Sequence, residues 1–156
     1  MCIRDSTEDG RILPITDSQL VILVVTDHGA DRRRLMRLVV DIHGERPICV
    51  EREEMISNPE ADVDEFVISE DLSTAAVLWN QAGISNLELL SLGDDQRVQV
   101  RRTVELPGMV AADLSITDNG QLLALTVEGP NLPPTVEVLR LAVSYTHLTL
   151  PTSDLV

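Results

Sequence analysis

Residues 68–80 (ISEDLSTAAVLWN) decide the fold, because their pattern returns along the chain. An apolar residue, a polar turn and an apolar strand recur 48 residues later in residues 116–126 (ITDNGQLLALT). An alternating strand follows each copy, at residues 87–92 (LELLSL) and 136–141 (VEVLRL), which lie 49 residues apart. A fixed repeat of about 20–50 residues is typical of solenoids and propellers and therefore has priority in assigning the fold.

An earlier copy of the repeat lies upstream. Residues 19–27 (QLVILVVTD) and 35–40 (LMRLVV) occupy the equivalent places, with residue 35 lying 52 residues before residue 87. The apolar residues alternate or form short runs, without the i, i+3, i+4 spacing of a helix. Further strands are predicted at residues 46–52 (RPICVER) and 98–106 (VQVRRTVEL). Tight reversals are predicted where Gly, Asn and Asp gather, at residues 27–29, 42–44, 93–95 and 118–120.

These strands predict an all-β protein of about three four-stranded antiparallel blades, which form an incomplete β-propeller. The blades are expected at approximately residues 11–57, 61–107 and 108–142. A β-sandwich is the alternative, but a sandwich does not predict such even spacing. Three blades alone would leave two apolar blade faces uncovered, each on the order of several hundred Å².

The composition excludes several classes of partner. The chain has 156 residues, a formal charge of −14 and a pI near 4.4. Such a charge repels nucleic acids and anionic membranes, so neither is predicted as a partner. The longest apolar run, residues 20–25, is far shorter than the ~20 residues of a membrane-spanning helix. Aromatic residues make up 2% of a chain that is 44% hydrophobic, so the core is expected to be aliphatic.

The two ends of the chain resemble translated adapter DNA. Residues 1–5 (MCIRD) and 143–147 (VSYTH) can be encoded by DNA strings that are reverse complements of each other. This relation is typical of the transposon-end adapter used in sequencing libraries. Residues 1–6 and 143–156 are therefore expected to be adapter-derived, and residues 7–142 to be a natural propeller segment. Part of residues 143–150 is nevertheless expected to lie along the unpaired edge of the last blade. Localisation stays open, with a slight preference for the cytoplasm, because a signal peptide would precede residue 7.

Several motifs resemble the N-terminal propeller of the prolyl oligopeptidase family of serine peptidases. They comprise the sequence of residues 68–71 (ISED), 78–80 (LWN) and 86–90 (NLELL), together with Gly83. Residues 106–110 (LPGMV), 116–124 (ITDNGQLLA) and 128–130 (EGP) continue the resemblance. It covers nearly all of residues 11–142, although the blade motifs are degenerate and partly shared with Tol-type periplasmic propellers.

The resemblance implies a non-catalytic role. In that family the propeller caps an α/β-hydrolase domain and limits the access of large folded substrates to it. The implied partners are the hydrolase domain of the same parent chain and a peptide substrate that passes the propeller. No cofactor, metal or catalytic residue is assigned to this chain, so it is predicted not to be an enzyme by itself. A binding or scaffold propeller of Tol type, without a hydrolase, is the alternative.

Nucleophile and metal motifs are weak. A nucleophile elbow requires G-x-S-x-G, whereas the sequence from Gly83 to Ser85 lacks the second glycine and is expected in a hairpin loop. His28 and His43 fall in predicted turns. Asp27, His28 and Asp31 could ligate a metal, but their spacing does not supply three or four fixed ligands. A polar hairpin is predicted there instead.

The remaining candidates are given structural roles. Arg32, Arg33 and Arg34, like Arg101 and Arg102, could bind an anion but are expected to pair with neighbouring acids. Glu53 and Glu54 resemble the glutamate pair with which dipeptide-trimming relatives hold an amino group. They lack the flanking aromatic residues and are interpreted as a solvated edge. Cys49 is expected to be a packed core thiol, and Trp79 to fill space between neighbouring blades.

Overall fold

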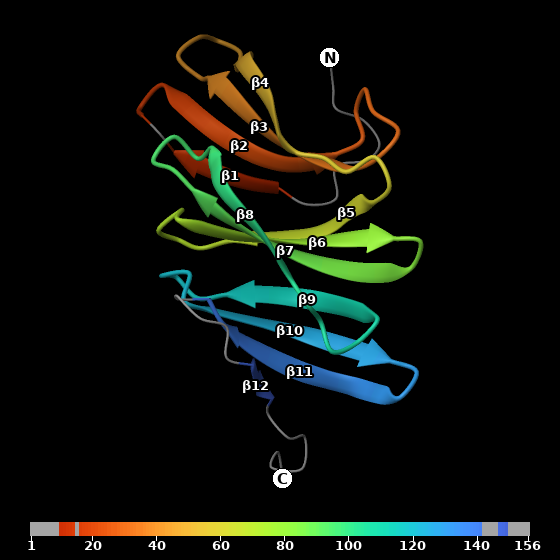
Figure 1. The fold of residues 1–156 in the computed structure, drawn as a ribbon. Coiled ribbons are helices and arrows are strands. Elements are labelled where there is room, and N and C mark those ends of the chain that lie inside the picture. The colour runs from red at the N-terminus through yellow and green to blue at the C-terminus, as the bar shows by residue number, and fades with distance from the viewer. Residues whose placement is uncertain (1–9, 15, 142–146, 150–156) are drawn as a thin grey trace. The chain divides into compact units, whose positions relative to one another are not determined.

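The computed structural model describes residues 10–14, 16–141 and 147–149. Every helix or strand assigned in this part of the chain is a β-strand (Figure 1). The strands form three four-stranded sheets, each with its strands in chain order. The all-β, blade-like architecture predicted from the repeat is thereby confirmed. The chain divides into two compact units, Met1–Val63 and Asp64–Val156, which are described separately below.

The first sheet belongs to the first unit. It comprises β1 (Gly10–Pro14), β2 (Gln19–Thr26), β3 (Arg34–Asp41) and β4 (Ile48–Ile56), all paired antiparallel. Alternation divides its side chains between two faces. One face carries side chains that are almost fully buried, namely Val21, Leu23, Val25 and Leu35.

The second and third sheets belong to the second unit, apart from the first two residues of β5. The second sheet consists of β5 (Asp62–Ile68), β6 (Thr74–Gln81), β7 (Ile84–Leu92) and β8 (Val98–Val104). The third consists of β9 (Val110–Ile116), β10 (Leu122–Gly129), β11 (Leu132–Arg140) and β12 (His147–Thr149). The two sheets pack through an aliphatic core, as the low aromatic content predicts. Its fully buried members include Ala76, Leu78, Leu87, Leu123, Leu125, Val127 and Leu139.

Polar contacts join these two sheets at the edge of that core. The backbone N–H of Leu114 donates a hydrogen bond to Oε1 of Glu65 at 2.7 Å. This contact lies beside a β-bulge in β9, where Asp113 adopts a φ of 58°. A bulge leaves ladder groups without a partner on the neighbouring strand. Glu65 therefore satisfies a donor that the bulge releases, and it ties the second sheet to the third.

The turns follow the predicted positions. The Ala30 N–H donates to the carbonyl of Asp27 at 2.8 Å, which closes the turn between β2 and β3 around Gly29 at φ 73°. The corresponding turn in the third sheet is closed by the Gly120 N–H and the Thr117 carbonyl at 2.8 Å. Gly120 has a φ of 64°, a conformation that residues with a Cβ adopt reluctantly.

Three strand predictions need correction. β1 was not predicted, because its short sequence GRILP contains glycine and proline and shows no clear alternation. The fourth strand of the first sheet runs over Ile48–Ile56 instead of residues 46–52, because arginines on β3 pair with its acidic end. β11 begins at Leu132, earlier than expected, despite two prolines, because these lie beside a register shift at the strand start.

The end of the chain contributes one strand. Residues 147–149 pair antiparallel with β11, so that residue 148 lies opposite Val138. This confirms the expectation that part of residues 143–150 lies along the edge of the last blade. The expectations for residues 1–6 and for a break at residue 151 fall outside the described residues.

Candidate functional site

The histidine-containing turns have local structural roles. The His28 backbone N–H donates to Oγ1 of Thr26 at 3.0 Å, and the His43 N–H donates to Oδ1 of Asp41 at 2.9 Å. Both histidine side chains are exposed. Residues 27–31 form the predicted polar hairpin turn. No group of three or more His, Cys, Asp or Glu residues among those described is arranged to hold a metal ion.

Ser85 lies in a strand, contrary to the prediction of a hairpin loop. It is the second residue of β7, and its hydroxyl accepts a hydrogen bond from the Ala111 N–H at 2.9 Å. The Ser85 N–H in turn donates to the Met109 carbonyl at 2.8 Å. These bonds connect the second and third sheets. Ser85 therefore supports the packing of the blades, as Glu65 does.

Two of the three consecutive arginines form the expected ion pairs in the first unit. Arg32 pairs with Asp62 at 2.8 Å, and Arg34 pairs with Glu54. The Arg33 N–H also donates to Asp62, and this bond is the main reason why the pKa of Asp62 lies below its usual range, with Arg32 adding to the effect. The Ser57 hydroxyl, followed by Arg34, lowers the pKa of Glu54. Both carboxylates therefore remain charged and paired at neutral pH.

Glu53 and Glu54 lie within β4 and do not follow it. The predicted solvated edge is wrong, because both face arginines on the neighbouring strand. Arg37 approaches Glu51 at 3.2 Å and Glu53 at 4.0 Å. Arg37 itself is almost fully buried. These acids are thus engaged in cross-strand ion pairs.

A buried polar cluster lies on the second sheet. Trp79 Nε1 donates to Oε2 of Glu88 at 2.9 Å, and Arg101 contacts both Glu88 oxygens at 2.8 and 3.0 Å. Trp79 is 4% exposed and Glu88 is 9% exposed. Hydrogen bonding to Glu88 raises the pKa of Arg101. Sequence reasoning did not find this cluster, although alternation along β7 places Glu88 opposite the Leu87 and Leu89 face.

Cys49 is exposed, so the prediction of a packed core thiol is wrong. It lies on β4, the outer strand of the first sheet, between two other exposed apolar residues, Ile48 and Val50. An apolar sequence pattern does not reveal whether a strand is central or at an edge. The thiol donates a hydrogen bond to the Glu51 carbonyl at 3.3 Å.

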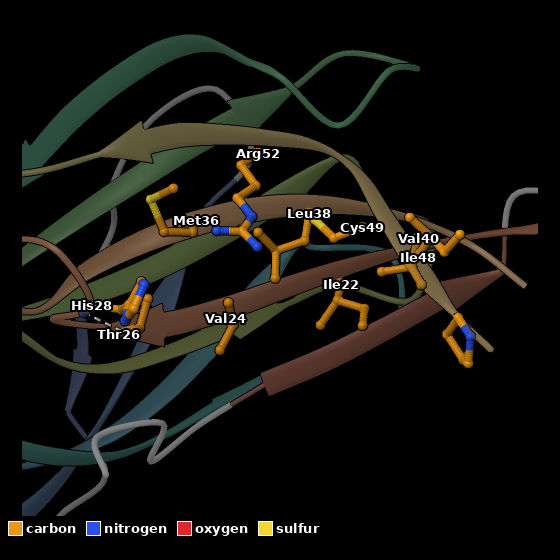
Figure 2. Close-up of a pocket in the computed structure, with 11 residues that line it drawn as sticks. Ile22, Val24, Thr26, His28, Met36, Leu38, Val40, Ile48, Cys49 and Arg52 are labelled. Carbon is orange, nitrogen blue, oxygen red and sulfur yellow. Dashed lines mark hydrogen bonds between the residues drawn. The ribbon is translucent and has the colours of Figure 1, made fainter. Parts of the chain in front are cut away.

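A hollow of about 500 Å³ lies on the first sheet, on the face opposite Val21 and Leu23. Figure 2 shows the side chains that line it, which come from β2, β3, β4 and the adjoining turns. Most are apolar, including Ile22, Val24, Met36, Leu38, Val40 and Ile48. Arg52 enters this apolar hollow from β4. The first sheet thus has the incompletely buried apolar face that the blade interpretation predicts.

The described residues contain no helix of the length and hydropathy needed to cross a membrane. No family model matches the sequence, and no curated protein matches it. The fold, in contrast, has close counterparts among solved structures.

Three such structures are prolyl peptidases. A prolyl endopeptidase shares 20% identity at a TM-score of 0.62, with 96% of this chain and 20% of that chain covered. Prolyl oligopeptidase B from Galerina marginata, in its apo form, shares 15% identity at a TM-score of 0.63 over 94% of this chain and 20% of the enzyme. A variant of that enzyme bound to a 35mer hydrolysis and macrocyclization substrate shares 14% identity at a TM-score of 0.59, with the same coverage. The chain thus spans about a fifth of the length of these enzymes, and its sheets have the fold of a segment of the prolyl oligopeptidase propeller.

Proposed function

We propose that this chain is a non-catalytic propeller segment of a longer serine peptidase. In the parent protein the propeller would cap an α/β-hydrolase domain and limit which peptides reach its active site. The observation that carries the proposal is the structural match to a prolyl endopeptidase, which extends over 96% of this chain. The partners would be the hydrolase domain of the same chain and the peptide substrate that passes the propeller.

The side chains support this role through what they contact. The Ser85 hydroxyl bonds the backbone of the neighbouring sheet, and the paired acids Glu54 and Asp62 bind arginines of their own unit. Each of these groups therefore stabilises blades or joins them. As part of the same proposal, residues 1–6 and 143–156 derive from adapter DNA, and residues 7–142 are the natural segment.

The natural reading frame around residues 7–142 tests this proposal. Overlapping DNA reads should replace both ends, and the frame should continue to a G-x-S-x-G motif followed by Asp and then His. The purified parent should cleave peptides after proline and lose activity when a fluorophosphonate modifies its serine. A frame that ends after further blades would favour the Tol-type scaffold. A natural stop near residue 142 would contradict both interpretations.

A further inference from the structure

The repeat aligns one arginine on each of the first two sheets. Arg52 lies 49 residues before Arg101, and the strand registers agree, because Leu38 pairs with Arg52 as Leu90 pairs with Arg101. On the second sheet Arg101 is held by Glu88. On the first sheet the position of Glu88 is occupied by Met36, 52 residues earlier. Arg52 therefore lacks the carboxylate that its counterpart has.

The surroundings of Arg52 make this difference consequential. Within the described part of the chain Arg52 forms no salt bridge, and its side chain lies over the hollow near Met36 and Leu38 (Figure 2). The rest of the hollow is mainly apolar, and the exposed Ile48 continues it along β4. Any element that covered this face without an anion would bury an unpaired guanidinium, which is strongly unfavourable.

The second unit shows what covers an equivalent face. On the third sheet Leu123, Leu125 and Leu139 pack against side chains of the second sheet, among them Leu78 and Leu87. The occupant in that case is a β-sheet. Glu137 is also buried on this face of the third sheet, since it pairs with Leu125 in the register. Buried charge is thus compatible with sheet packing when it is accommodated.

We infer that the hollow face of the first sheet binds a further β-sheet whose facing side chains are apolar apart from a carboxylate set against Arg52. The inference rests on the proposed function, because a longer propeller supplies such a sheet. A second copy of the chain, packed through the same face, would bring a second Arg52 against the first. The like charges disfavour that arrangement.

The chemistry of the hollow can be measured on the 156-residue chain itself. The probe is 8-anilinonaphthalene-1-sulfonate, which combines an apolar ring system with an anion. Arg52→Gln should weaken its binding about tenfold, the scale of one lost charge-assisted hydrogen bond. Arg46→Gln, an exposed arginine in the turn before β4, is the matched control and should change binding less than about twofold. Equal affinities of the two variants would show that Arg52 is not available to an anion.

The occupant is tested in the parent protein through Cys49, which lines the hollow and is exposed in this chain. Its reaction with 5,5′-dithiobis(2-nitrobenzoic acid), followed by mass spectrometry of the Cys49 peptide, should be about a hundredfold slower in the parent. Arg52→Gln should restore at least about tenfold of that rate, corresponding to 1.4 kcal/mol, whereas Arg46→Gln should not. An equally reactive Cys49 in parent and chain, or identical behaviour of the two variants, would overturn the inference.

Two further outcomes separate this inference from the proposed function. A protected Cys49 in a parent without a hydrolase would support the docking surface and refute the peptidase. A hydrolase-containing parent with a reactive Cys49 would do the reverse. Protection of Cys49 in the 156-residue chain that increases with protein concentration would identify a second copy as the occupant and refute the inferred sheet.

Discussion

At the scale of single residues, Glu88 holds the second sheet through two partners, Trp79 and Arg101. Glu88→Ala should lower the free energy of unfolding by about 2 kcal/mol, because a buried indole N–H loses its acceptor and Arg101, which is 46% exposed, loses its ion pair. Urea unfolding followed by the fluorescence of the single tryptophan measures the loss. Glu105→Ala, at an exposed position just after β8, is the control and should be nearly neutral. Equal losses would refute the role of the cluster.

Asp62 gives the chain a stability that depends on pH. Its pKa lies below the ordinary value of 3.8 because the Arg33 N–H and Arg32 bind the charged form. The ionised carboxylate therefore stabilises the folded chain above that value, and its contribution is lost as the pH falls through the lower folded pKa. Asp62→Asn should cost about 1 kcal/mol at pH 7 and little near pH 2. Urea midpoints between about pH 2 and 7 test this, with the exposed Asp31→Asn as a pH-independent control.

At the scale of elements, the turns differ in how tightly they are packed. Gly29 and Gly120 both adopt positive φ, at 73° and 64°. A Cβ on Gly29 would meet no atom within 4 Å, whereas one on Gly120 would lie 2.8 Å from Oγ1 of Thr74 on the second sheet. Gly29→Ala should therefore cost about 1 kcal/mol through backbone strain alone. Gly120→Ala should cost at least about 1 kcal/mol more, because the turn must move away from β6. Equal urea midpoints for the two variants would show that this turn does not pack tightly on the second sheet.

The contact between Glu65 and Leu114 should also stabilise the packing of two sheets. Glu65→Ala removes the acceptor of a bulge N–H and should cost about 1–2 kcal/mol, whereas Glu65→Gln keeps an oxygen acceptor and should cost less. Amide hydrogen exchange at Leu114 provides a local readout. Its protection should fall in Glu65→Ala and remain in Glu65→Gln. Unchanged protection in both variants would contradict the proposed contact.

At the scale of the whole molecule, the large negative charge opposes folding. With a formal charge of −14, the compact chain repels itself more than the expanded one does. Added sodium chloride should therefore raise the melting temperature between about 0.01 and 0.5 M, as the Debye length falls from about 30 Å to a few Å. Thermal unfolding followed by circular dichroism measures this. A melting temperature that stays constant or falls would show that ion pairs such as that between Arg32 and Asp62 outweigh the repulsion.

The isolated chain is expected to hydrolyse no peptide bond. Its described serine candidate, Ser85, is held by the backbone of Ala111, and the described histidines lie in turns of the other unit. A fluorogenic peptide with proline before the scissile bond is the appropriate substrate. Turnover above the buffer blank by purified chain would refute this prediction, and a Ser85→Ala variant would show whether that serine is responsible.

Sequence alone determined the repeat, the all-β class and most strands, because alternation and turn residues are local consequences of the chain. The turns at Gly29 and Gly120 were found in this way. Cys49 was misplaced, because its apolar neighbours look the same on an outer strand as on an inner one. The tertiary structure decided what pairs across strands: Glu88 with Trp79 and Arg101, and Arg34 with Glu54. Register sets those pairings, and a one-residue shift would place each side chain on the opposite face.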